Sequence, residues 1–387
     1  MTLPAVLRTP RRRSAAAPFW ANGVLYGTWA SRIPEIQAQT GLGEGALGLA
    51  LLGLAAGLVV SASAAGPLVA RLGAHRVTLW ALAVFAAGVV GPGLATGFGS
   101  LALALVGVGL ASGLLDVAMN AWAAEVEAAD GASILGACHG LFSLGGMVGA
   151  GIGALAAAAS VPLGLHFGAS GLVFAGATLV QGWRAWAPRS EAPVHDGPAV
   201  AWPTGPVAGL AALAVCGLVV EGAVADWGAV FMREVLAASP AVAALGFAAF
   251  SACMAGTRFG ADALTDRWGD ASVVRAGAAV GAVGLATVVL APAVWIAVVG
   301  FGLVGLGMAA VVPALFRAAS RAPLPPGVGI AAVASAGYLG FLAGPPVLGF
   351  VAEAAGLRVS FGLLVALAAA VALGSRAAFR KVRETEG

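Results

Sequence analysis

Charged side chains are scarce in this chain, and their scarcity limits what the chain can be. Only 10% of the 387 residues are charged, whereas 60% are hydrophobic and the mean hydropathy is +0.97. Soluble globular domains carry about 25% charged residues, so a soluble fold is excluded. The apolar runs are about 20 residues long and do not alternate, which favours membrane helices over the strands of a barrel. We therefore predict an all-α polytopic membrane protein.

Lysine and cysteine are also rare, and this excludes several activities. Lys381 is the only lysine, so there is no phosphate-binding loop of the type G-x4-G-K-S/T that a transport ATPase needs. The three cysteines, Cys138, Cys216 and Cys253, lie in apolar runs without metal-ligand spacing. Neither a zinc-hydrolase motif nor a nucleophile elbow occurs. We expect no metal, no cofactor and no enzymatic activity.

Twelve apolar runs predict twelve transmembrane helices in two six-helix halves. The runs are 18–37, 45–70, 77–96, 99–124, 132–158, 161–182, 206–231, 240–262, 271–291, 294–318, 328–352 and 357–379. The predicted parts are an N-terminal tail (1–17), a first half (18–182), a proline-rich linker (183–205), a second half (206–379) and a C-terminal tail (380–387).

The arginines predict the orientation, because loops on the cytoplasmic side of a membrane are enriched in basic residues. With the N-terminus inside, only Arg32, Arg233 and Arg358 face outward. We expect both termini in the cytoplasm and the chain in the plasma membrane, the inner membrane of a bacterium. The net charge of +3 reflects this topology, so we expect no nucleic-acid partner. No small-residue cleavage site follows the first apolar run, which we interpret as an uncleaved helix.

The two halves contain an internal repeat. Four residues between the second and third helices match four residues between the eighth and ninth at an offset of 196 (66 to 262). They are Gly66, Leu68, Arg71 and Gly73 in the first half and Asp262, Leu264, Arg267 and Gly269 in the second. Repeats of an even number of helices predict parallel halves with a site between them near the middle of the membrane. One such site is sufficient for a monomer.

These loops resemble the major facilitator superfamily, whose signature is G-x-L-A/G-D-R-x-G-R-K/R. The first copy, GPLVARLG (66–73), has Ala70 where the acid is expected, and the second, LTDRWG (264–269), follows Asp262 in place of the glycine. The segments LDVAMN (115–120) and HGLFSLGG (139–146) are similar to the fucose-permease-like branch and its MosC-like members. The resemblance implies secondary transport of a sugar-like or polyol-like solute, with the acid at position 116 in proton coupling.

Four ionisable residues are candidates for proton coupling: Asp116, His139, Glu221 and Asp226. A carboxylate at membrane depth costs several kcal/mol, so it is paired, protonated or turned toward water. Asp116 and His139 lie at similar distances from the turn between their helices, which predicts that they meet at one depth. A purely structural role for each remains an alternative, and for Asp226 so does a gate or a solvated helix end.

The candidate substrate residues are Asn22, Trp29, Asn120 and Trp227. Asn120 lies one helical turn from Asp116 on the same face. Trp29 and Trp227 occupy equivalent places in the two halves (29 to 227), where an indole suits stacking on a sugar ring. An aromatic belt at the membrane boundary is the alternative for both tryptophans.

A gate is predicted at the cytoplasmic end. Arg258, Asp262 and Asp266 lie at i, i+4 and i+8 and lead into Arg267, so they predict a ladder of ion pairs on one helix face. We assign the gate to this ladder together with the repeated loop residues Gly66, Arg71, Gly73 and Gly269. A permanent clamp is the alternative.

The function predicted from the sequence is proton-coupled secondary transport of a small polar solute by alternating access. Its expected partners are that solute, protons and the lipid bilayer. Proton-driven export is an alternative, because Gly136, Gly145, Gly149 and Gly153 partly match an antiporter signature. A sensor that has a transporter fold but moves nothing is the alternative from another class.

Overall fold

The computed structural model describes residues 5–184, 201–325 and 327–384, and the regular elements within these ranges are helices. The first half contains α1 (Pro10–Ala30), α2 (Ile33–Thr40), α3 (Glu44–Leu72), α4 (Ala74–Gly88), α5 (Val90–Gly93), α6 (Phe98–Asp130), α7 (Leu135–Ala158), α8 (Leu163–Ser170) and α9 (Gly176–Arg184). The second half contains α10 (Ala208–Glu234), α11 (Pro240–Trp268), α12 (Asp270–Leu290), α13 (Val294–Met308), α14 (Val311–Ser320), α15 (Val328–Ala355) and α16 (Leu357–Glu384). Short helical turns at Ala5–Leu7, Gly171–Ala175 and Gly205–Val207 complete the described elements.

Twelve crossing helices are confirmed. Within the described ranges, 11 helical segments are long and apolar enough to span a membrane. Three of them join two α-helices, at α4 with α5, at α8 with α9, and at α13 with α14, and a fourth joins the short turn Gly205–Val207 to α10. The twelfth is α1, which carries an arginine run in its first turns and packs against α7 inside the bundle.

The first predicted run, 18–37, differs in detail from the structure. Helix α1 begins earlier, at Pro10, where the Thr9 hydroxyl accepts a hydrogen bond from the Arg12 amide at 3.2 Å. It ends at Ala30, and a separate helix, α2, starts at Ile33. Pro34 explains the break, because its ring would clash with the carbonyl of the residue four positions earlier in a continuous helix.

Glycine allows the helices of the first half to pack closely. Helix α7 lies against α1, and a Cβ atom on Gly149 would overlap the backbone of Val24. A Cβ on Gly145 would likewise meet backbone atoms of α1. Close backbone approach of this kind stabilises helix pairs in lipid, where the hydrophobic effect contributes little.

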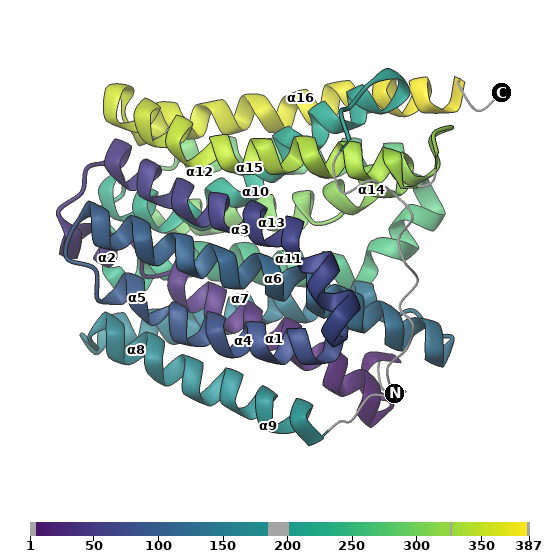
Figure 1. Cartoon of the computed structure of the whole chain (residues 1–387). Coiled ribbons are helices and arrows are strands. Elements are labelled where there is room, and N and C mark those ends of the chain that lie inside the picture. The colour runs from purple at the N-terminus through teal and green to yellow at the C-terminus, as the bar shows by residue number, and fades with distance from the viewer. Residues whose placement is uncertain (1–4, 185–200, 326, 385–387) are drawn as a thin grey trace.

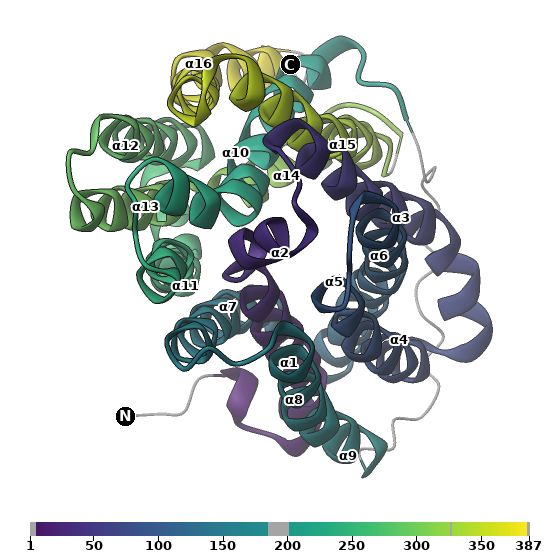
Figure 2. The same ribbon diagram turned by 90° about the vertical axis from the view of Figure 1, so that its left-hand side faces the viewer.

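The two halves lie side by side and meet along two helix pairs, α7 with α11 and α3 with α15 (Figure 2). The internal repeat extends to the backbone. Gly73, between α3 and α4, has φ of +86°, and Gly269, between α11 and α12, has φ of +75°. Only glycine adopts these angles without strain, which explains why both loops carry it.

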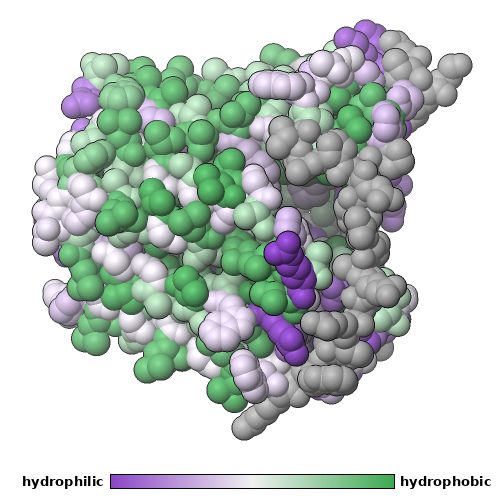
Figure 3. Space-filling view, in the orientation of Figure 1, coloured by the Kyte–Doolittle hydropathy of each residue, from purple (hydrophilic) through white to green (hydrophobic). Residues whose placement is uncertain are grey.

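The described parts of the two chain ends lie at the same end of the bundle, to the right in Figure 1. Hydrophobic side chains cover most of the face shown in Figure 3, as expected for a surface in contact with lipid. Short helix α2 lies at the opposite end, between the two halves when the bundle is viewed along its length (Figure 2). Many of the predicted polar residues lie in the interior between the two halves.

Candidate functional site

Asp116, Asn120 and His139 form a hydrogen-bonded row between α6 and α7. The Asn120 side chain donates to Asp116 Oδ1 at 3.2 Å and to the Asp116 carbonyl at 2.9 Å. His139 Nε2 lies 3.1 Å from Asn120 Oδ1. Asp116 and His139 are thus at neighbouring depths, but Asn120 joins them and they do not pair directly. An amide oxygen only accepts hydrogen bonds. The His139 tautomer with its proton on Nε2 is therefore the one that donates to Asn120.

Arg258 of α11 joins the two halves. Its guanidinium lies 3.6 Å from Glu221 Oε2 on α10 and donates to Ser143 Oγ on α7 at 2.9 Å. Ser143 in turn donates to the His139 carbonyl at 3.2 Å. The Glu221 and Arg258 side chains are only 18% and 15% exposed, so the charged pair is held largely away from water.

These contacts form a polar path across the interface between the halves, which between His139 and Ser143 passes through the His139 backbone carbonyl and not through its imidazole ring. The path runs through Asp116, Asn120, His139, Ser143, Arg258 and Glu221. Isolated charges in an apolar interior are costly, and a linked row of partners lowers that cost.

The sequence predicts Arg258 in the gate ladder, and the structure gives it different neighbours. It contacts Glu221 and Ser143 inside the bundle, because its side chain points toward α10 and α7. Asp266 and Arg267 are exposed, and Arg267 lies over the ring of Trp268 at 5.9 Å. The side chain of Asp262 lies outside the described residues. The described contacts join Arg258 to the central path, and the predicted ladder with Asp262 stays a prediction.

The repeated loop residues lie near the end that carries both termini. Gly66 and Arg71 are exposed, and Gly73 and Gly269 form the turns described above. A Cβ on Gly66 would meet nothing within 4 Å among the described residues.

A second group of predicted residues lies nearer the other end. Trp29 and Trp227 are only 3% and 1% exposed, so they are interior side chains and do not form an aromatic belt. Their indole N–H groups are buried without a hydrogen-bond partner among the described residues. Asp226 is 5% exposed, and Tyr26 lies within electrostatic range of it. Asn22 is also buried and its amide contacts Met119 Sδ at 3.9 Å.

Aromatic rings cluster around Tyr26, beside Trp29 of this second group. Tyr26 lies 6.0 Å from Trp29 between ring centroids, 6.1 Å from Phe142 and 6.2 Å from Phe247. Phe247 belongs to the second half, so the ring cluster also spans the interface. Buried indole donors beside flat aromatic faces are typical of sites that bind ring-shaped polar molecules.

A buried ion cluster that the sequence does not predict lies beyond the tryptophans. Arg32 is 4% exposed and lies 2.9 Å from Glu35, while His166 Nδ1 is 3.3 Å from its guanidinium. Arg32 also donates to the Val161 carbonyl at 3.2 Å, tying the α1–α2 turn to α8. Burial raises the pKa of Glu35, although neighbouring Arg32 acts in the opposite direction. The short polar run that follows α1 is the feature of the sequence from which this cluster could be predicted.

This architecture, with two helical halves around a charged interior, defines a membrane transport protein. The chain is 35% identical over 373 residues to an uncharacterized transporter, y4wD, of Sinorhizobium fredii, covering 93% of this chain and 97% of the relative. It is 34% identical to an uncharacterized MFS-type transporter of Yersinia pestis, covering 95% of each chain, and 28% identical to membrane protein MosC of Rhizobium meliloti, covering 94% and 88%. No family model matches the chain.

Solved structures share the fold. A point mutant of the nucleoside transporter NupG superposes with a TM-score of 0.77 at 11% identity, over 96% of this chain and 100% of that one. The D-xylose-proton symporter superposes with a TM-score of 0.75 at 14% identity, over 94% and 96%. The chain belongs to the major facilitator superfamily. It is an integral membrane transporter for a small molecule, two of these relatives are named as transporters, and the expected resemblance to MosC is confirmed.

Proposed function

We propose that this transporter couples proton movement to the transport of a small polar solute of the sugar or polyol type. The observation that carries the proposal is the polar path from Asp116 to Glu221, because it places a carboxylate on each side of the interface between the halves. Protonation of a buried carboxylate removes a charge and changes which contacts across that interface are favourable.

Arg258 is the proposed switching group. When Glu221 is ionised, it holds the guanidinium at 3.6 Å on the second half. When Glu221 takes a proton, the attraction disappears and the arginine is left in a dry site without an anion. Asp116, at the far end of the path on the first half, is then the remaining carboxylate toward which Arg258 is drawn. This exchange of partners would shift the balance between the two orientations of the halves.

The aromatic group around Trp29 and Trp227 is the proposed substrate site. Their buried indole donors, which lack partners among the described residues, are satisfied when a solute hydroxyl accepts from them. Asp226 can accept hydrogen bonds from further hydroxyls, and the Tyr26 ring offers a stacking face. Structural likeness to a D-xylose-proton symporter and a nucleoside transporter supports a ring-shaped, hydroxyl-bearing solute.

We assign the conformation described here to an inward-facing state. Trp29, Trp227 and Arg32 are buried at the end where α2 packs against α10. At the opposite end Arg71 and Asp266 are exposed. The arginine bias of the sequence supports a cytoplasmic position for that exposed end and both termini. We propose a monomer in the bacterial inner membrane, since one pair of halves encloses one site.

The glycines that resemble an antiporter signature do not favour export. Gly145 and Gly149 lie against α1, where a side chain would overlap backbone atoms, so close packing accounts for them. Import and export are distinguished by the direction of movement against a known gradient.

The test uses purified protein in liposomes that contain a pH-sensitive dye. Pentoses, hexoses, polyols, nucleosides and cationic drugs are added in turn to the parent, to Asp116→Asn and to Trp29→Phe. We expect a sugar or polyol to cause dye-reported proton movement with the parent, none with Asp116→Asn, and a raised half-saturating concentration with Trp29→Phe. Proton movement only with cationic drugs would refute the proposed substrate class, and unchanged proton movement with Asp116→Asn would refute its role in coupling.

A further inference from the structure

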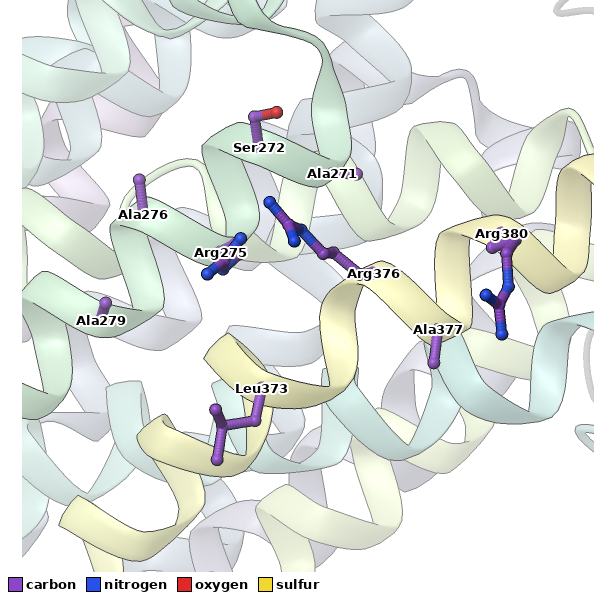
Figure 4. Close-up of a pocket in the computed structure, with 9 residues that line it drawn as sticks. All are labelled: Ala271, Ser272, Arg275, Ala276, Ala279, Leu373, Arg376, Ala377 and Arg380. Carbon is purple, nitrogen blue, oxygen red and sulfur yellow. The ribbon is translucent and has the colours of Figure 1, made fainter.

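A basic pocket lies away from the central path, on the outer surface between α12 and α16. It has a volume of about 1060 Å³ and is lined by arginines and small residues. Arg275 comes from α12, and Arg376 and Arg380 come from α16 (Figure 4). None of the described residues that line it is acidic. The pocket therefore gathers positive charge from two helices that are far apart in the sequence.

Two of these arginines converge without a partner. Figure 4 shows the side chains of Arg275 and Arg376 pointing into the same space between the helices. Both are exposed, and neither has an ion pair or hydrogen bond with another residue that the structure describes. Nearby Asp270 is not their partner, because its carboxylate oxygens form ion pairs with Arg317 at 3.2 Å and with Arg321 at 3.1 Å. Like charges that point together repel unless an anion lies between them.

The rest of the lining is apolar and small. Ala276, Ala279 and Ala377 leave the hollow open, and Leu373, which is 83% exposed, projects beside it. The arginines lie near the start of α12 and toward the end of α16, whose last turns reach the end of the bundle that carries both termini (Figure 1). Ala279 and Leu373 lie further from these helix ends. A ligand that matches this arrangement of arginines and apolar residues has an anionic head at the membrane boundary and a hydrocarbon chain toward the membrane interior.

We propose that this pocket binds an anionic phospholipid. Its phosphate lies between Arg275 and Arg376, which can each offer two N–H donors to phosphate oxygens. Its acyl chain lies along the alanine-lined groove beside Leu373. The bound lipid would join α12 to α16 on the outside of the second half, at a distance in the fold from the proposed proton path.

The experiment measures lipid binding by native mass spectrometry of the delipidated full chain. The probes are phosphatidylglycerol, phosphatidylcholine with the same acyl chains, and soluble glycerol phosphate. We expect phosphatidylglycerol to bind at least about 10-fold more tightly than phosphatidylcholine, since basic residues beside a membrane attract anionic lipids. Glycerol phosphate should not compete, because it lacks the acyl chain.

The variants separate this pocket from charge in general. Arg275→Gln with Arg376→Gln should weaken phosphatidylglycerol binding about 25-fold, at about fivefold for each arginine. Arg76→Gln removes one exposed arginine from the other half and should leave binding unchanged, while Arg376→Lys keeps the charge and should retain most of it. Equal binding of the two lipids, unchanged binding by the double variant, or competition by glycerol phosphate would each overturn the proposal.

Discussion

The ion pair between Glu221 and Arg258 gives the most quantitative prediction. At 3.6 Å and an effective dielectric constant of about 20, the attraction is about 4 to 5 kcal/mol. Glu221→Gln removes the negative charge but keeps the shape, and among the described residues it leaves the arginine with its bond to Ser143. Removing one partner of a buried pair costs about 3 to 5 kcal/mol. Because both side chains retain some exposure to water, we expect about 2 to 3 kcal/mol.

The assay is a double-mutant cycle, measured by unfolding in mixed micelles of mild detergent and dodecyl sulfate. It compares the parent with Glu221→Gln, Arg258→Gln and the variant that carries both changes. Each single change should lower the free energy of unfolding, and the double change should lower it by less than their sum. The expected coupling energy is about 2 kcal/mol. Additive effects, with coupling below about 0.5 kcal/mol, would refute the reasoning that Arg258 depends on Glu221.

Three further predictions concern helix packing, a loop and pH. Gly149→Ala should destabilise the fold by about 1 to 3 kcal/mol because the added Cβ meets the α1 backbone. Gly151→Ala should not destabilise it, because no described atom lies within 4 Å of the added Cβ. Unfolding in mixed micelles measures both effects. Gly269→Ala should cost about 1 kcal/mol because φ is +75°, and an unchanged melting temperature would contradict this. Burial raises the pKa of Glu35, so the folded state binds more protons than the unfolded state between the two pKa values. As pH rises through that interval, the parent should therefore lose stability relative to Glu35→Gln, and a difference in melting temperature that does not vary with pH would contradict this.

Much of the fold follows from local sequence properties. Hydropathy and helix length predict the twelve crossings, because each helix must satisfy its own backbone in lipid. The 196-residue offset (73 to 269) predicts equivalent loops, and the two glycines do share a positive φ. The break after Ala30 follows from Pro34, although hydropathy alone merges α1 with α2.

The contacts between helices are harder to predict. The depth of Asp116 and His139 follows from helical rise, but the insertion of Asn120 between them depends on side-chain rotamers. The i, i+4 spacing around Arg258 predicts partners on its own helix. Its observed partner Glu221 is on α10, and the sequence does not contain the rotation of one helix against another. The same rotation decides whether Trp29 and Trp227 face the lipid or the interior, so the sequence alone also allows an aromatic belt.

The central claim is that proton-driven accumulation of the solute requires the Asp116 carboxylate. Exchange of labelled for unlabelled solute across liposomes needs no net proton movement, whereas accumulation driven by a pH gradient does. Both are measured on the parent and on Asp116→Asn with the solute identified in the liposome panel. We expect the variant to keep exchange and to lose accumulation. Accumulation by Asp116→Asn to the level of the parent would contradict the account.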